Sequence, residues 1–188
     1  SGKGYSNVFH ADGGSAAFSV MANTLRGVYG TDVLLATANS FTGSVLQADY
    51  NKKMAASMIM PNGLMSRQRT MTGAELKETV RAFVEGCEGG FVPFNRGSLP
   101  VVSGIAVEVK EAGGSYTLTG ITRNGQPLGD NDTVTVTCLA TEKQMEALLA
   151  SDSGTSAGED TWVKYTWTDY VSGGKAVLAE PENYMTLR

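Results

Sequence analysis

The sequence predicts an α+β fold in which helices pack on a mixed, largely antiparallel β-sheet. Segments 15–29 and 72–86 carry apolar residues at helical spacing, whereas 105–110 and 133–137 alternate apolar and polar residues, as half-buried strands do. Asn124-Gly125 is a dipeptide typical of the tight turn between two antiparallel strands. Helical and strand patterns therefore occur along the same chain, with hairpin turns between neighbouring strands.

The most informative segment runs from Met71 to Gly104 and begins as a helix. Thr72 and Glu75 form a capping box, because the hydroxyl accepts from the amide three residues on while the glutamate accepts from the Thr72 amide. Gly86 ends the helix, and a strand opens near Val101. The segment between them, GGFVPFNRGSLP, is an irregular loop rich in glycine and proline.

This loop holds four candidate binding residues: Phe91, Phe94, Asn95 and Arg96. Two aromatic rings beside an amide and a guanidinium are suited to stack on a flat heterocycle, read its edge and contact a phosphate. The alternative is that both rings cover the core beneath the loop and that Arg96 is a solvated surface charge. The residues alone leave both interpretations open.

The remaining elements follow from the same patterns. Ser15 is the expected N-cap of the first helix, which ends before Gly30. A short apolar run, 33–38, predicts a buried strand, and it places Asn39 and Ser40 at the carboxyl end of that strand, where ligand groups often lie. Further expected elements are a helix at 52–57, strands at 64–71 and 116–123, a helix capped by Thr141 and Gln144, and a last helix at 160–171.

Length and charge restrict the domain organisation and the partners. We expect residues 1–12, which are polar and glycine-rich, to be a linker or lead-in, and residues 13–188 to form one domain. The formal net charge is −4, whereas proteins that bind nucleic acid polymers cluster Lys and Arg against the phosphates. No apolar run approaches the about 20 residues of a membrane-spanning helix. We therefore expect no nucleic acid polymer as a partner and no membrane segment in this chain.

Few residues are available for metal or nucleophilic chemistry. A two-metal phosphatase site needs several His and Asp ligands, and the chain has one histidine, His10, which we expect to be solvated. Cys87 and Cys138 are expected to be two separate buried thiols, although a disulfide between them stays open. A methionine-rich stretch from Met54 to Met65 is interpreted as core filling rather than as a soft-metal site. We expect no catalytic residue and no metal site in this chain.

Four segments, TGAELKETVRAFVEG, GGFVPF, VVSGIAVEV and ITRNGQPLGDNDTVTVTCLAT, follow one another in the chain. This ordered set resembles the C-terminal domain of the 5'-nucleotidase family, whose pattern runs TGaqLke, GgFlqvsG, a strand and nGkPLdpdktYtVat. The likeness extends upstream through Asp32 to Asn39 and covers most of the chain. It implies a layered α/β/β/α arrangement and a single 5'-nucleotidase C-terminal-like domain over residues 13–188.

The resemblance also implies a function. In this family the C-terminal domain recognises the nucleoside or nucleotide, while divalent metals in a separate N-terminal metallophosphoesterase domain support hydrolysis. The resemblance therefore predicts that this chain is the substrate-binding domain of a hydrolase of nucleotide catabolism and that it holds no cofactor itself. It further implies a bacterial parent protein that is secreted, periplasmic or attached to the cell surface.

Individual site residues follow from the same resemblance. The family clamps the base between two rings and holds phosphate with an arginine; the first ring corresponds to Phe91 or Phe94. The family's NGGGIR turn corresponds to the NSFTGS that begins with Asn39 and Ser40, so its arginine is absent here. The second ring and a GGDG turn are absent as well, where this chain reads CLATEKQMEALL. Arg96 is the candidate replacement for the missing arginine.

These departures leave two alternatives to nucleotide recognition. One is a non-catalytic extracellular binding or interaction module that kept the fold and lost the nucleotide site. The other is a structural domain without a ligand. A site with one ring and no anion partner would bind a nucleotide weakly, because one base–aromatic stack contributes roughly 1–3 kcal/mol.

Overall fold

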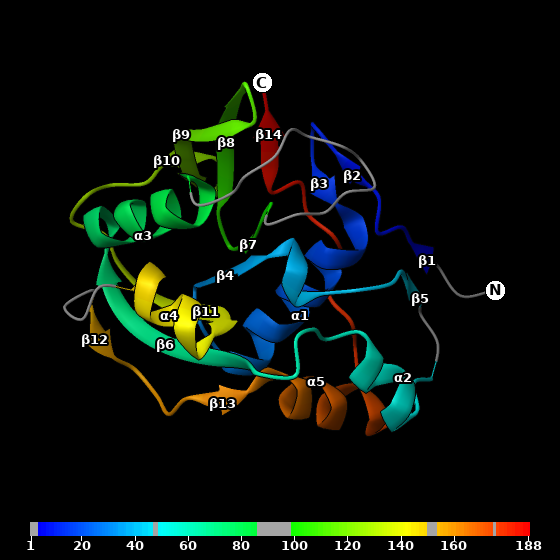
Figure 1. Cartoon of the computed structure of the whole chain (residues 1–188). Helices are drawn as coiled ribbons and strands as arrows, with labels where there is room; N and C mark the ends of the chain where they lie inside the picture. Colours follow the sequence, from blue (N-terminus) through cyan, green and yellow to red (C-terminus); the bar gives the residue numbers. More distant parts are fainter. Residues whose placement is uncertain (1–3, 47–48, 86–98, 150–153, 175) are drawn as a thin grey trace.

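The computed structural model describes residues 4–46, 49–85, 99–149, 154–174 and 176–188, and these form two mixed β-sheets and five α-helices (Figure 1). The helices are α1 (Ala16–Tyr29), α2 (Lys52–Ser57), α3 (Gly73–Glu85), α4 (Glu142–Leu148) and α5 (Val163–Ser172), with one 3₁₀ turn, η1 (Ala38–Ser40). The helices expected from the first capping signal, the 52–57 segment and both capping boxes are therefore confirmed.

The larger sheet has the strand order β12-β6-β11-β4-β7, and β13 also pairs with β6. Its neighbours are antiparallel except β11 and β4, which run parallel. The nine-residue pairing of β6 with β11 is the longest in this sheet, from Thr133 opposite Thr72 to Thr141 opposite Leu64. The strands are β4 (Val33–Thr37), β6 (Leu64–Thr72), β7 (Pro100–Ser103), β11 (Thr133–Thr141), β12 (Thr155–Ser156) and β13 (Thr161–Trp162).

The smaller sheet has the order β10-β9-β8-β14, in which only β14 and β8 run parallel. Its strands are β8 (Ala106–Ala112), β9 (Ser115–Arg123), β10 (Gln126–Pro127) and β14 (Met185–Leu187). Four short strands form two further pairs: β1 (Gly4–Tyr5) with β5 (Val45–Leu46), and β2 (Phe9–His10) with β3 (Gly14–Ser15). The predicted α+β class with mixed, largely antiparallel sheets is confirmed.

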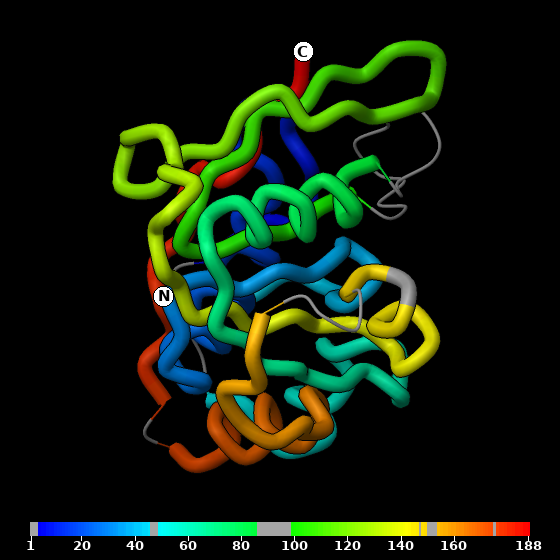
Figure 2. Tube along the Cα trace, turned by 90° about the vertical axis from the view of Figure 1, so that its left-hand side faces the viewer, coloured from blue at the N-terminus to red at the C-terminus, as the bar shows by residue number. Residues whose placement is uncertain are grey.

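Helix α3 packs between the two sheets. It contacts β9 of the smaller sheet and β4 and β6 of the larger one, and Figure 2 shows it between the β8–β9 hairpin and the larger sheet. Leu76, Val80 and Phe83 are buried along this helix, as their spacing predicts. The apolar stripe of α3 therefore contributes to one continuous core.

The predicted helix starts have the expected hydrogen bonds. At α3, the Glu75 amide donates to Thr72 Oγ1 over 3.2 Å, and the Thr72 amide donates to Glu75 Oε2 over 2.7 Å. The same reciprocal pair joins Thr141 and Gln144 at α4. The Ser15 hydroxyl accepts from the Phe18 amide at α1. Each cap satisfies amides that the first turn of a helix cannot pair internally.

Part of the segment expected as a lead-in is packed into the domain. Tyr5 and Phe9 are buried, and the ring of Phe9 lies edge-on to that of Phe18, with centroids 5.6 Å apart. His10 is exposed at the end of β2. Phe9 of this segment thus packs against α1, and Tyr5 pairs with Val45 of β5.

The last residues return to the first ones. The Ser15 amide donates to the buried Tyr184 hydroxyl over 3.1 Å, and the Gly13 amide donates to the Met185 carbonyl over 2.7 Å. Strand β14 then continues parallel to β8, with Met185 opposite Val107 (Figure 1, red beside green). The two ends of the described chain therefore pack against each other and against the smaller sheet.

The start of the last helix differs from the prediction. Thr161 and Trp162 pair with β6 as strand β13, and α5 begins only at Val163. The reason is a polar contact that sequence periodicity does not encode: the Thr161 and Ser66 hydroxyls lie 2.7 Å apart, and Ser66 is fully buried. Pairing with β6 therefore takes the place of a first helical turn.

Cys138 lies on β11 as a free, fully buried thiol, while Cys87 lies outside the described residues. Burial raises the pKa of the Cys138 thiol to about 12, so that it carries almost no thiolate at neutral pH. We expect Cys138, as the single cysteine of a Cys87→Ala variant, to resist a thiol reagent at pH 8 until the protein is unfolded. Spectrophotometric thiol titration with and without denaturant checks this, and rapid reaction of the folded variant would contradict it.

Candidate functional site

A hollow at one edge of the larger sheet is the candidate site. Because β4 and β11 run parallel and β6 runs antiparallel to β11, the carboxyl ends of β4 and β11 meet the amino end of β6 at the same edge. Carboxyl ends of sheet strands are a common place for ligand groups. The hollow has a volume of about 430 Å³ and is lined by Thr37, Asn39, Ser40, Met60, Pro61, Leu64, Thr141, Lys143 and Gln144. We call it the Asn39 hollow.

The first wall comes from η1, directly after β4. The Ala38 amide donates to the Leu99 carbonyl over 2.8 Å, and the Ser40 carbonyl accepts from the Met60 amide over 2.9 Å. These bonds fix the turn, with Asn39 exposed and Ser40 buried. The structure therefore brings both predicted residues to the hollow, but only Asn39 presents a side chain that is open to solvent.

The second wall is the start of α4. The capping box uses Gln144 Oε1 to accept from the Thr141 amide over 3.1 Å and from the Thr141 hydroxyl over 2.9 Å. Lys143, between them, is exposed, and it forms no ion pair within the described part of the chain. Its ammonium is the cationic group among the described lining residues.

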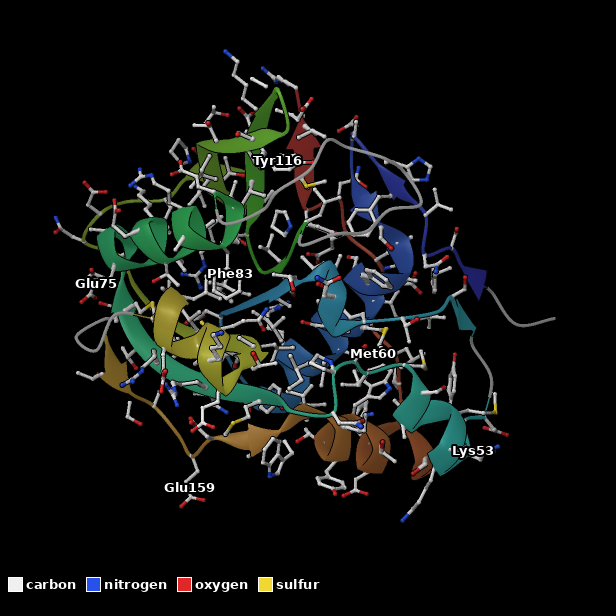
Figure 3. All side chains as sticks on the ribbon, viewed as in Figure 1. Lys53, Met60, Glu75, Phe83, Tyr116 and Glu159 are labelled. Carbon is white, nitrogen blue, oxygen red and sulfur yellow. The ribbon has the colours of Figure 1, made fainter. Side chains whose placement is uncertain are left out.

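The third wall is the connection from α2 to β6. It contains a cis peptide bond between Met60 and Pro61, and Figure 3 places Met60 in this connection. Met60 is 51% exposed and Met54 is 46% exposed, whereas Met58 is buried. The interpretation of these methionines as core filling is thus wrong for Met54 and Met60, since local spacing alone does not show which turn of an irregular segment faces the core.

Four predicted site residues, Phe91, Phe94, Asn95 and Arg96, lie outside the described residues. Their role as an aromatic and cationic loop stays a prediction. The residue that sequence reasoning missed is Lys143. The Thr141–Gln144 capping box predicts that Lys143 lies in the first turn of a helix. Lys143 lines the same hollow as Asn39 only because β11 pairs in parallel with β4, and no local sequence pattern specifies that pairing.

Within the described ranges, no three His, Cys, Asp or Glu side chains gather closely enough to hold a metal ion. None of the helices in the described part of the chain is both long and apolar enough to cross a membrane.

No family model matches the sequence, and no curated protein matches it significantly. Solved structures do match. The 5'-nucleotidase precursor of Thermus thermophilus superposes with a TM-score of 0.66 at 14% identity, over 98% of this chain and 38% of that one. The NAD nucleotidase of Haemophilus influenzae gives 0.64 at 16% identity, over 94% and 33%.

A third solved structure has a different activity. The sulfate thiohydrolase of Thermus thermophilus, solved in complex with glycerol, superposes with a TM-score of 0.63 at 14% identity, over 92% of this chain and 32% of that one. This chain thus spans about a third of the length of each of the three structures. This chain has the same fold as about one third of a 5'-nucleotidase structure. The resemblance to the 5'-nucleotidase family that its motifs indicated is thereby confirmed at the level of the fold.

Proposed function

We propose that this chain is the substrate-recognition domain of a 5'-nucleotidase-like phosphohydrolase and that it binds a nucleoside or nucleotide. The observation that carries the proposal is a fold likeness to two nucleotidases over nearly the whole of this chain, which covers only 38% and 33% of those two chains. The Asn39 hollow supports it, because it lies where the resemblance expects the family's substrate-contacting turn.

The polar groups of the Asn39 hollow suit a ligand with an anionic end. Asn39 offers an amide that can both donate and accept, and Lys143 offers a point charge without a competing carboxylate among the described residues. Lys143 would then contact the phosphate that the family holds with the absent arginine, while Phe91 or Phe94 would stack on the base. Catalysis would come from divalent metals in a separate N-terminal metallophosphoesterase domain of the parent protein.

We expect the chain to bind AMP about five-fold more tightly than adenosine, because an exposed charge pair contributes up to about 1 kcal/mol. Lys143→Gln should remove this difference and leave adenosine binding unchanged. Phe94→Ala should weaken both ligands by about ten-fold through loss of a stacking ring. Titration calorimetry with both ligands on each variant measures these affinities.

Lys110→Gln is the matched control, because Lys110 is an exposed lysine on β8, which is not part of the Asn39 hollow. It should retain the preference for AMP. Equal binding of AMP and adenosine by the wild type would remove the role of Lys143 and keep base recognition. No binding of either ligand to the wild type at millimolar concentration would refute nucleotide recognition by this domain.

A second candidate function is a binding module that kept this fold and lost the nucleotide site. Two observations favour it: the arginine of the family's NGGGIR turn is absent from NSFTGS, and the fold also occurs in a sulfate thiohydrolase. An upstream domain with paired metal-ligand motifs in the parent gene would favour the hydrolase, whereas an unrelated neighbouring domain would favour the module. For either function we propose a bacterial protein that is secreted, periplasmic or attached to the cell surface.

A further inference from the structure

A second hollow lies at the other end of β4, where Asp32 precedes the strand. It has a volume of about 330 Å³ and lies between the end of α1, the start of β8 and the β9–β10 turn. We call it the Asp32 hollow, and the resemblance assigns no role to it. Its lining residues are Arg26, Asp32, Gly104, Ile105, Ala106, Thr122, Arg123, Asn124, Gly125, Glu182 and Asn183.

The carboxylate of Asp32 is already occupied by protein donors. Its Oδ2 accepts from the Thr135 amide over 2.8 Å and from the Thr135 hydroxyl over 2.9 Å, and its Oδ1 accepts from Arg123 over 2.7 Å. The Thr135 amide, followed by the Thr135 hydroxyl and the Arg123 charge, holds the pKa of Asp32 below its usual value despite some desolvation. Asp32 is therefore ionised at neutral pH and serves to position the guanidinium of Arg123.

Arg26 is positioned by different atoms. Its Nε donates to Ser103 Oγ over 2.8 Å, and one terminal nitrogen donates to the Asp32 carbonyl over 3.3 Å. Ser103 in turn donates to Asn23 Oδ1 over 2.5 Å. The guanidinium of Arg26 is thus oriented by neutral groups, and it forms no ion pair with a described carboxylate.

Both guanidinium groups keep free donors. An arginine carries five N–H donors, and within the described residues Arg26 uses two of them and Arg123 uses one. Glu182 also lines the hollow but forms no ion pair with either arginine. The lining therefore carries two guanidinium groups and two carboxylates, of which only Asp32 pairs with an arginine, and seven guanidinium N–H groups have no protein partner among the described residues.

From this geometry we propose that the Asp32 hollow binds a small oxyanion, a phosphate or carboxylate group held by Arg26 and Arg123. Guanidinium groups match both kinds of group, because their planar N–H pairs bond two oxygens at once. The Asn124-Gly125 turn and the backbone of Gly104, which packs against the Asp32 carbonyl, complete the lining of the hollow. This inference does not depend on nucleotide binding at the Asn39 hollow.

Amide chemical-shift mapping of the wild-type chain tests the proposal without any substitution. Inorganic phosphate and malonate are titrated separately at constant ionic strength, with chloride as the reference anion. We expect saturable shifts at the amides of Gly104, Ala106, Asn124 and Gly125 for at least one of the two oxyanions. Saturation by phosphate alone, by malonate alone or by both identifies the group that is bound, and no saturable shift at these amides with either would overturn the site.

Substitution of Arg123 tests which group holds the ion. Arg123→Gln should weaken oxyanion binding by about ten-fold or more, because a charge-assisted fork is lost. Arg123→Lys should restore part of the affinity through its charge alone. Arg188→Gln is the matched control, since Arg188 is an exposed arginine with only a 3.9 Å ion pair to Glu108. Equal affinities of the Arg123→Gln and Arg188→Gln variants would exclude Arg123 as a ligand.

Discussion

Replacing Trp167 by alanine is expected to lower the free energy of unfolding by about 3–5 kcal/mol, as is typical when a large aromatic side chain is removed from a core. Trp167 is fully buried on the inner face of α5, and the buried residues Val163 and Val171 lie one helical turn before and after it. Its loss leaves a cavity that a rigid sheet and helix cannot close. Urea denaturation followed by circular dichroism measures the change.

Trp162→Ala is the matched control, because Trp162 lies five residues earlier and is 48% exposed. It should change stability by less than about 1 kcal/mol. Trp167→Phe should cost much less than Trp167→Ala, because the indole Nε1 of Trp167 has no hydrogen-bond partner among the described residues and leaves no group unpaired. Similar losses for Trp167→Ala and Trp162→Ala would contradict the packing described for α5.

Gly104→Ala is the second substitution with a large expected effect. Gly104 has φ +81°, and a Cβ added there would lie 2.0 Å from the Asp32 carbonyl oxygen. The clash is with backbone atoms, so β4 and β7 must separate to relieve it, and the positive φ adds strain of its own. We expect a loss of about 3 kcal/mol or more, measured by thermal and urea unfolding.

Gly113→Ala separates the two causes of that loss. Gly113 also has a positive φ, +62°, but a Cβ there would have no heavy atom within 4 Å. It should lose only about 1 kcal/mol, the cost of the backbone conformation. Equal losses of stability in Gly104→Ala and Gly113→Ala would show that the clash with the Asp32 carbonyl does not contribute to the need for glycine at position 104.

Elements that depend on neighbouring residues could be predicted from the sequence. The caps at Ser15, Thr72 and Thr141 and the turn at Asn124-Gly125 all form as expected, with Asn124 at φ 52°. Each of them involves a hydrogen bond or a backbone angle within four residues. Such short-range interactions are fully contained in a sequence window.

Features that depend on distant segments could not be predicted. Strand β13 replaces the expected helix start because Thr161 meets Ser66, which is 95 residues away in the chain. The same limit applies to the candidate site: strand 33–38 correctly placed Asn39 at a sheet edge, whereas Lys143 reaches that edge only through the parallel pairing of β11 with β4. Register between distant strands is set by the assembled core, not by local spacing.

The contact of residues 13–15 with Tyr184 and Met185 has a consequence for folding. Tyr184 bonds Ser15 across 169 positions of sequence, and β14 closes the smaller sheet beside β8. Helix α1, whose Ser19 hydroxyl donates to the Glu182 carbonyl, is therefore covered only after the segment that carries Glu182 and Tyr184 has been synthesised. Contacts between such distant positions favour slow folding, because the entropy of closing a long loop is lost before the contact can stabilise the fold.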